Sequence, residues 1–310
     1  MAKAMLVFAV AIGAAFALAI WHGNRDVAPL HADERLHAFK QAVSWMRANE
    51  VDILQDDNVA LWWFVSVAAE HTGDEYLRGL FQRFLDESRD RPWVGEAWRR
   101  MVEPDAEVVW DPSSVRKLEP YQRFFYHALT CVPVALSEGV DTNVFLQGSA
   151  CHPLPTKVWV KDPVCTTHQL VGVVLLQRRG CKPAQELVSL RKDLLDDIRE
   201  QMAVDVVVKD AYLQRVMMLM WQGDPDSVKP IWLQRALRAQ QPDGGWIGGR
   251  QMPELPQALQ PWFIRSQLAK WWPSRFHAAS TSDFHASAQG LLITALALKP
   301  AEAAGGLVRP

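Results

Sequence analysis

The sequence predicts an all-α protein built from two kinds of helix. From His31 onward, apolar residues recur at helical spacing almost throughout the chain. No convincing run of alternating apolar and polar residues marks a strand. Hydrophobic residues make up 49% of the 310 residues and charged residues 22%, which is ordinary for a protein with a folded core. An all-α body follows from these observations.

The N-terminal segment is apolar enough to predict export. Residues 4–21 carry no charge and have about the length of a bilayer-spanning helix, roughly 20 residues. Lys3 precedes them, which favours an orientation with the body outside the cytoplasm. We expect residues 1–24 to be a signal anchor in the cell membrane. A cleaved signal peptide is the alternative, because Ala15-Phe16-Ala17 fits a cleavage site and the periplasmic or extracellular body would then be released.

Amphipathic helices are the first of the two kinds. Leu36, Phe39, Val43 and Met46 share one face of a helix at 33–49. The same pattern recurs at residues 74–88, 184–202 and 227–240. Asp74 is expected to cap the helix that follows it.

Five stretches of the second kind begin alike. Each has a polar or capping residue, then a large polar residue, an apolar run and a Gly, Pro or polar break. They span residues 55–74, 118–139, 165–183, 209–225 and 282–300. The large polar residues near their starts are Asn58, Tyr121, His168, Tyr212 and His285. The expected caps of the last three stretches are Thr166, Asp210 and Asp283.

The alternation of apolar and amphipathic helices predicts how they are arranged. An apolar helix is surrounded by protein, whereas an amphipathic helix keeps one face in water. Helical hairpins closed into a ring satisfy both, so we predict an α/α toroid over residues 31–300 and a flexible tail at 301–310. The inner-helix N-termini would then meet at one end, around a cavity that faces their N–H groups. An open helical solenoid would show the same alternation.

One motif links the chain to known toroids. Gln240, Gly244 and Trp246 form a Q-x-x-x-G-x-W motif. It resembles the motif of α/α-toroid proteins such as the squalene–hopene cyclases, and is similar to Q-x-x-D-G-G-W stretches of some pectate lyases. In those families it closes a helical hairpin, with Gln capping and Trp packing on the next helix. The acidic D-x-D-D motif of the cyclases is absent, so the resemblance implies the fold and not terpene cyclisation.

A second resemblance concerns metal binding. Protein prenyltransferase β-subunits are also toroids, and they bind zinc through an Asp-x-Cys at the start of one inner helix and a His from another. Asp283-Phe-His285 is similar, with His in place of Cys, and His168 begins another helix. The resemblance implies a site for zinc or another divalent metal at His168, Asp283 and His285.

The same residues allow two other interpretations. His168, Tyr212, Asp283 and His285 could be catalytic residues of a polar cavity without metal, with Tyr212 or Asp210 as proton donor, proton acceptor or supporting group. They could also be purely structural, since Asp283 is a good N-cap and a histidine at a helix start can hydrogen-bond a loop carbonyl. The three interpretations remain open.

The four cysteines agree with export. An even number in an oxidising compartment predicts two disulfides. A helix over 166–180 would separate Cys165 from Cys181 by about 24 Å, far more than the ~7 Å that a disulfide spans. We prefer Cys131–Cys181 with Cys151–Cys165, because the second pair closes a local loop. The alternatives are Cys131–Cys165 with Cys151–Cys181, free thiols, or cysteines that bind a metal.

Net charge and the absence of common motifs limit the classes of function that the sequence supports. A formal charge of −2 without a Lys/Arg-rich run predicts no nucleic-acid partner. The chain contains no G-x-S-x-G, H-E-x-x-H, P-loop or G-x-G-x-x-G motif. We expect a hydrolase or lyase, with metal optional, that acts on a cell-envelope carbohydrate, peptide or lipid-like molecule. A non-catalytic envelope ligand-binding or scaffold protein is the alternative.

Overall fold

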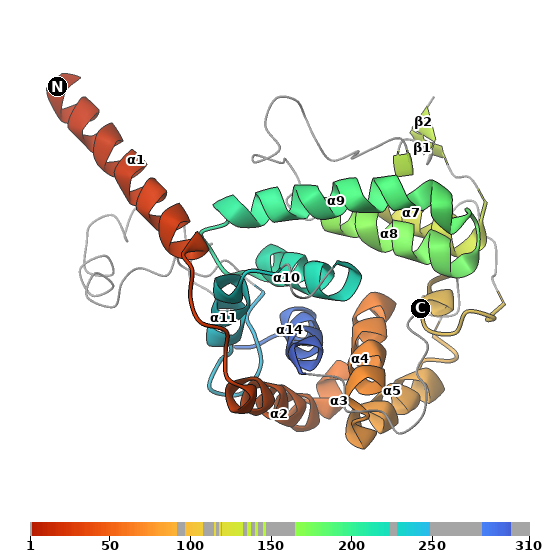
Figure 1. The fold of residues 1–310 in the computed structure, drawn as a ribbon. Helices are drawn as coiled ribbons and strands as arrows, with labels where there is room; N and C mark the ends of the chain where they lie inside the picture. The colour runs from red at the N-terminus through yellow and green to blue at the C-terminus, as the bar shows by residue number, and fades with distance from the viewer. Residues whose placement is uncertain are drawn as a thin grey trace.

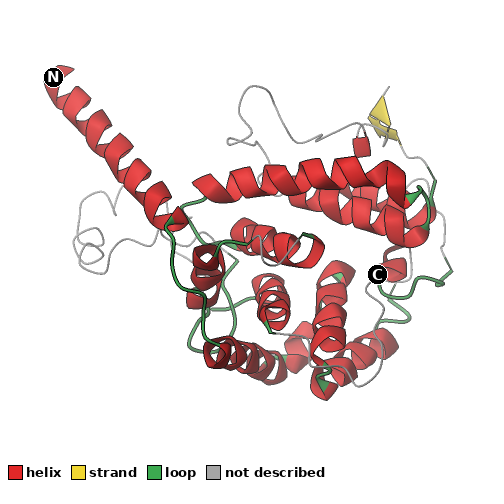
Figure 2. Cartoon of the chain, viewed as in Figure 1, coloured by secondary structure: helices red, strands yellow, loops and turns green. Residues whose placement is uncertain are grey.

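The chain is helical almost throughout its described residues, as predicted (Figure 2). The computed structural model describes residues 2–91, 97–107, 115, 118, 120–132, 135–137, 140–141, 145–146, 165–223, 228–248 and 281–298. Cys151 and the predicted tail at 301–310 lie outside the described residues. A short antiparallel hairpin of β1 (Ala135–Ser137) and β2 (Val140–Asp141) was not predicted.

The helices follow the order of the predicted stretches (Figure 1). They are α1 Ala2–Asn24, α2 Ala32–Ala48, α3 Glu50–Ile53, α4 Val59–Thr72, α5 Glu75–Glu87, the 3₁₀ helix η1 Ala97–Met101, α7 Pro120–Thr130, α8 Cys165–Arg179, α9 Ala184–Val204, α10 Asp210–Gln222, α11 Pro230–Arg238 and α14 Phe284–Ala297.

The two kinds of helix differ in burial as their sequences predict. In α14 every residue except His285 and Leu296 is buried. In α5, by contrast, the buried residues Leu77, Leu80, Phe84 and Leu85 form a single face. The described core is therefore made by nearly apolar helices, and amphipathic helices cover it.

Helices that are distant in sequence pack together around α14 (Figure 1). Helix α14 contacts α4, α10 and α2, and α10 also contacts α8 and α9. Helix α8 packs on α7 and α9, while η1 contacts both α7 and α4. Helices α5 and α11 lie on α4 and α10.

Two of the four predicted caps are confirmed. The carboxylates of Asp74 and Asp283 accept N–H bonds from Leu77 and Ala286, at 2.9 and 2.8 Å. The predictions for Thr166 and Asp210 were wrong, because each lies inside its helix and has a partner on another one. The Thr166 hydroxyl accepts from Gln201 Nε2 and Asp210 Oδ1 from Gln289 Nε2, at 2.9 and 2.8 Å.

The Cys131–Cys181 disulfide is present, as predicted. It joins the end of α7 to the turn after α8, and it lies just beyond the point where α7 ends. Cys131 has a positive φ of 61°, which no helix continues, and the following Pro133 disfavours helical geometry at Val132. The pairing of Cys151 with Cys165 stays a prediction, because Cys151 is outside the described residues.

Removing this disulfide is expected to lower the free energy of unfolding by about 2–4 kcal/mol. The bond closes a loop across a sequence separation of 50, and opening it frees the unfolded chain. The measurement compares urea midpoints of the wild type and a Cys131→Ser, Cys181→Ser variant without reductant. An unchanged midpoint, or a Cys165–Cys181 peptide in non-reducing mass mapping, would contradict the assignment.

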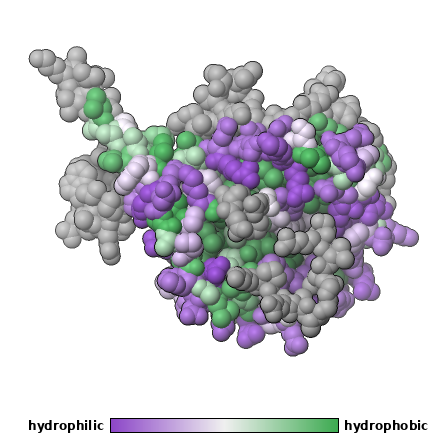
Figure 3. Space-filling model, viewed as in Figure 1, coloured by the Kyte–Doolittle hydropathy of each residue, from purple (hydrophilic) through white to green (hydrophobic). Residues whose placement is uncertain are grey.

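Helix α1 projects from the body and is fixed to it at its C-terminal end (Figure 1). The Asn24 amide donates to Ala203 O at 2.6 Å, and its Oδ1 accepts from Trp232 Nε1 at 3.3 Å. Beyond the body, the exposed residues of α1 are largely hydrophobic, including Phe16 and Trp21 (Figure 3). No helix in the described part of the chain combines the length and the hydropathy of a membrane span.

The Q-x-x-x-G-x-W motif follows α11 and packs against α14. The Gln240 amide donates to Ala38 O and Gly244 O, each at 2.9 Å, and Gly244 has a φ of 93° that favours glycine. Trp246 is buried, and its indole N–H donates to Ala236 O at 2.8 Å. Its ring lies over Gly290 of α14, so close that a Cβ there would meet ring carbons at 2.4 Å.

Substituting Gly290 by Ala is therefore expected to lower the free energy of unfolding by about 1–3 kcal/mol, the usual cost of overpacking a core. Gly79→Ala on α5 is the matched control. An added Cβ there meets only Arg83, at 3.7 Å, so alanine should raise stability by up to about 1 kcal/mol. Urea denaturation of the two variants checks the difference. Equal midpoints would contradict the close packing of Trp246 on α14.

Candidate functional site

A cavity of about 300 Å³ lies where the N-terminal ends of five helices meet. These helices are α4, α7, α8, α10 and α14, and η1 adds a further wall. The lining residues are Asp57, Asn58, Val59, Ala60, Leu61, Phe64, Trp98, Met101, Tyr121, Gln122, Phe125, His168, Val171, Gln214 and His285. Four of the five large polar residues predicted at helix starts are among them, namely Asn58, Tyr121, His168 and His285.

His168 lies on the wall of the cavity next to aromatic rings of α7. Its imidazole centroid is 4.4 Å from that of Tyr121 and 5.9 Å from that of Phe125. Tyr121 and Phe125 are one helical turn apart on α7, so both rings face α8 together. This contact positions the imidazole at the cavity through ring packing.

His285 reaches the cavity from the first turn of α14 and has a carboxylate beside it. Its Nε2 lies 3.5 Å from Asp210 Oδ1 of α10, and the two side chains are 50% and 26% exposed. The same Asp210 oxygen accepts from Gln289 Nε2 at 2.8 Å. Gln289 is fully buried one turn after His285, so α14 supplies both the imidazole and the amide that holds its partner.

Two amides add hydrogen-bonding groups. The side chain of Gln214 on α10 is buried, with 4% of the residue exposed, and its Oε1 accepts a hydrogen bond from the Thr167 hydroxyl. This bond fixes the amide so that Nε2 remains as a donor at the cavity. Asn58 is at the N-cap position of α4, yet its side chain makes no capping bond. Both amides therefore line the cavity with capacity to bind a ligand.

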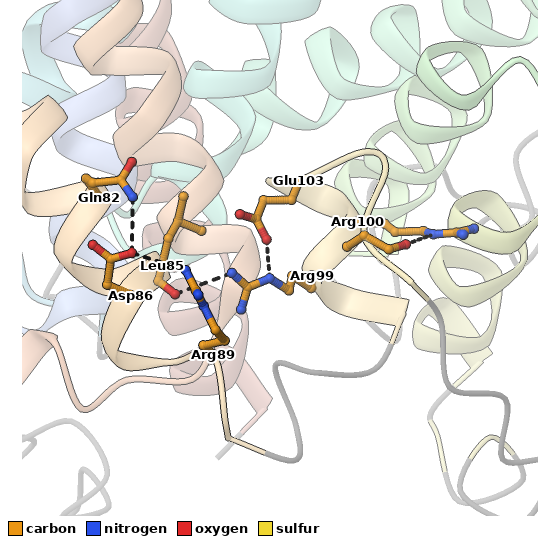
Figure 4. A network of polar contacts seen from close by, with 8 residues as sticks. Gln82, Leu85, Asp86, Arg89, Arg99, Arg100 and Glu103 are labelled. Atoms are coloured by element: carbon orange, nitrogen blue, oxygen red, sulfur yellow. Dashed lines mark hydrogen bonds and ion pairs between the residues drawn. The ribbon is translucent and has the colours of Figure 1, made fainter.

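The 3₁₀ helix η1 supplies Trp98 and Met101 to the cavity. Two arginines of η1, Arg99 and Arg100, make polar contacts beside it (Figure 4). Arg99 pairs with Glu103, and its Nη2 donates to Leu85 O at 3.3 Å. Arg100 Nε donates to Ala106 O at 2.8 Å. The bond to Leu85 O ties η1 to α5, whereas the contacts with Glu103 and Ala106 stay within residues 97–107.

The other two predicted site residues have different surroundings. Asp283 uses both carboxylate oxygens for backbone N–H groups, those of Ala286 and Gly248 at 2.8 and 2.6 Å. Tyr212 is fully buried, donates to Trp232 O at 3.0 Å and lies under the Arg235 guanidinium at 4.7 Å. Neither residue is among those that line the cavity.

The predicted metal ligands thus do not lie together as a set. Only His168 and His285 line the cavity, and the described residues hold no group of three or more His, Cys, Asp or Glu arranged around a metal position. What the arrangement offers is two imidazoles on one small cavity. Imidazole can donate or accept a proton near neutral pH, so such a pair can serve as general acid and general base.

Sequence reasoning identified Asp210 as a possible support of the site but missed Gln214 and Trp98. A signal for the first existed: Asp210 and Gln214 are four residues apart, and so on one face of α10. Trp98 comes from a 3₁₀ turn, which has no apolar periodicity to detect.

Comparison of the chain with known protein families, with curated proteins and with solved structures finds no match.

Proposed function

We propose that this protein is an exported enzyme, a hydrolase or lyase, whose cavity takes a small molecule of the cell envelope or one unit of an envelope polymer. The observation that carries the proposal is the presence of His168 and His285 on one cavity of about 300 Å³. Small-molecule sites span roughly 300–1,000 Å³, so this volume suits a compact group. The chain's residues would perform acid–base chemistry on it.

In this proposal His285 is the base. Asp210 beside Nε2 favours the tautomer with its proton on that nitrogen, which leaves Nδ1 to accept a proton. The proton would come from a water that attacks the substrate, or from a carbon next to the bond that breaks. His168 then donates a proton to the leaving group. The amides of Gln214 and Asn58 would hold the substrate between the two imidazoles.

A closed α/α toroid is part of the same proposal. The order of helix contacts supports it, since it runs from α4 through α14, α10, α8, α7 and η1 and returns to α4. Export, with attachment to the membrane through residues 4–21, is supported by the uncharged N-terminal segment and by the Cys131–Cys181 disulfide. Alkaline extraction of membranes and N-terminal sequencing of the purified protein distinguish an anchor from a cleaved signal peptide.

A non-catalytic ligand-binding protein is the second candidate. The observation in its favour is that amide and aromatic groups make up much of the lining, and these groups bind without doing chemistry. In that case the same cavity would hold a ligand for transport or sensing.

The test incubates the full chain with envelope polysaccharides, peptidoglycan fragments, peptides and lipids, and follows products by mass spectrometry. We expect a product that wild type forms and that His168→Ala and His285→Ala do not. His37→Ala is the matched control, because His37 is exposed on α2. Binding without turnover would favour the second candidate, and a product that both cavity variants still form would refute the site. Elemental analysis of the same preparation tests the prediction of zinc or another divalent metal.

A further inference from the structure

We propose that the ligand group in the cavity is an uncharged sugar ring. This inference rests on the proposed function only in taking the cavity as the ligand site, and it narrows the envelope molecule to one chemical class. It follows from how aromatic, polar and charged side chains are divided among the helices around the cavity.

Aromatic side chains come from adjacent elements. Helix α7 supplies Tyr121 and Phe125, and η1, which packs on α7, supplies Trp98. Phe64 of α4, which also contacts η1, continues this wall. Rings of this kind offer flat apolar surface at low cost in side-chain freedom, and the C–H face of a pyranose packs well on such a surface.

Polar side chains come from the other three helices, and the starts of α4 and α7 add two more amides. Helices α8, α10 and α14 supply His168, Gln214 and His285. Gln214 is held as a donor by Thr167, whereas the imidazoles can donate or accept. A sugar hydroxyl also both donates and accepts, so a ring of hydroxyls can satisfy this mixed set. A ligand with an apolar face and several hydroxyls therefore matches this combination of rings and hydrogen-bonding groups.

Charge among the described lining residues favours a neutral ligand. No Lys or Arg is among the lining residues, so a phosphate or carboxylate would find no fixed cation within this described cavity. The single carboxylate among the described lining residues, that of Asp57, is paired with Arg91 at 2.8 Å, which leaves little to attract an ammonium group. A polar but neutral ligand therefore fits the described lining residues.

The experiment is ligand-observed NMR with the full chain in a zwitterionic detergent, since detergents with sugar headgroups would compete. The probes are neutral hexoses, N-acetylhexosamines and their disaccharides. Glucuronate, glucosamine and an N-acetylated, amidated dipeptide serve as comparisons. We expect saturation transfer to at least one neutral sugar, and binding at least about tenfold weaker for its charged counterpart.

Two variants test the aromatic and the polar lining residues separately. Tyr121→Ala removes a ring, and Gln214→Glu removes the Nε2 donor while keeping an oxygen for Thr167. Each should weaken sugar binding by about tenfold. Tyr76→Ala and Gln177→Ala, both away from the cavity, should leave it unchanged. Thermal unfolding shows whether each variant folds, and a variant that does not is replaced by Tyr121→Leu or Gln214→Met.

The outcomes separate this inference from the proposed function. The inference is overturned if no sugar binds, or if Tyr121→Ala and Gln214→Glu both bind the sugar as tightly as wild type does. If the dipeptide or a charged probe binds instead, and His168→Ala and His285→Ala abolish that binding, the cavity is still a ligand site and only the sugar is wrong. If His168→Ala and His285→Ala change the binding of no probe, the proposed function fails as well.

Discussion

Replacement of His285 by Gln is expected to slow turnover by about 10²–10⁴-fold, the usual contribution of a general acid or base. Glutamine keeps a polar side chain of similar length at the mouth of the cavity, but it cannot take a proton. Substrate binding should change much less, because Gln214 and His168 still line the site. The measurement is kcat and KM with the substrate that the screen of envelope compounds identifies.

His37→Gln controls for a general effect of losing an imidazole, since His37 is exposed on α2. Full turnover by His285→Gln would remove this residue from the mechanism. His168→Gln should show a loss of the same order if the two imidazoles act as a pair. A large loss in only one of the two variants would leave a single general base.

Asp210→Asn separates chemistry from positioning. Asparagine keeps an oxygen for Gln289 Nε2, so the α10–α14 contact should survive, while the negative charge beside His285 Nε2 is lost. We expect a smaller loss of kcat than for His285→Gln, with little change in KM. Equal losses in both variants would show that His285 works only in the tautomer that the Asp210 carboxylate holds.

The helices could be predicted well from the sequence, because the faces of a helix that are buried determine the spacing of its apolar residues. An apolar run such as 284–297 is buried on every side, and the sole exposed polar residue in it, His285, was visible as an exception. His168 was found in the same way. Both residues line the cavity, whereas Gln289 of the same helix α14 is fully buried and donates to Asp210 instead.

Tyr212 and Asp283 show where sequence reasoning stopped. Residues 212 and 214 are two positions apart, hence about 200° apart around the helix, so they face different neighbours. Only the position of α11, which receives the Tyr212 hydroxyl, decides which of them meets the cavity. From the sequence, the Asp283 carboxylate could equally cap α14 or point into the cavity. The outcome depends on Gly248, 35 residues earlier in the chain, whose backbone N–H donates to the second carboxylate oxygen.

Substitution of Trp246 by Ala is expected to lower the free energy of unfolding by about 3–5 kcal/mol, as truncation of a large buried aromatic does. The ring fills the space above Gly290, and its N–H bond to Ala236 O is lost as well. Trp246→Phe should cost less, because it keeps a ring there. Urea denaturation gives both values. Trp21→Ala is the matched control, because Trp21 is 66% exposed and should change stability by less than about 0.5 kcal/mol.

The same variant should also disturb the site, because Trp246 holds the start of α14 through its backbone. Its N–H donates to Ser287 Oγ and its carbonyl accepts from Asp283 N, each at 2.9 Å. His285 lies between these two anchor residues, so a shift of the 246–248 segment would move the imidazole away from Asp210. Trp246→Ala should therefore lose ligand binding at urea concentrations where it is still folded. If it binds as wild type does, the motif stabilises the fold without positioning His285.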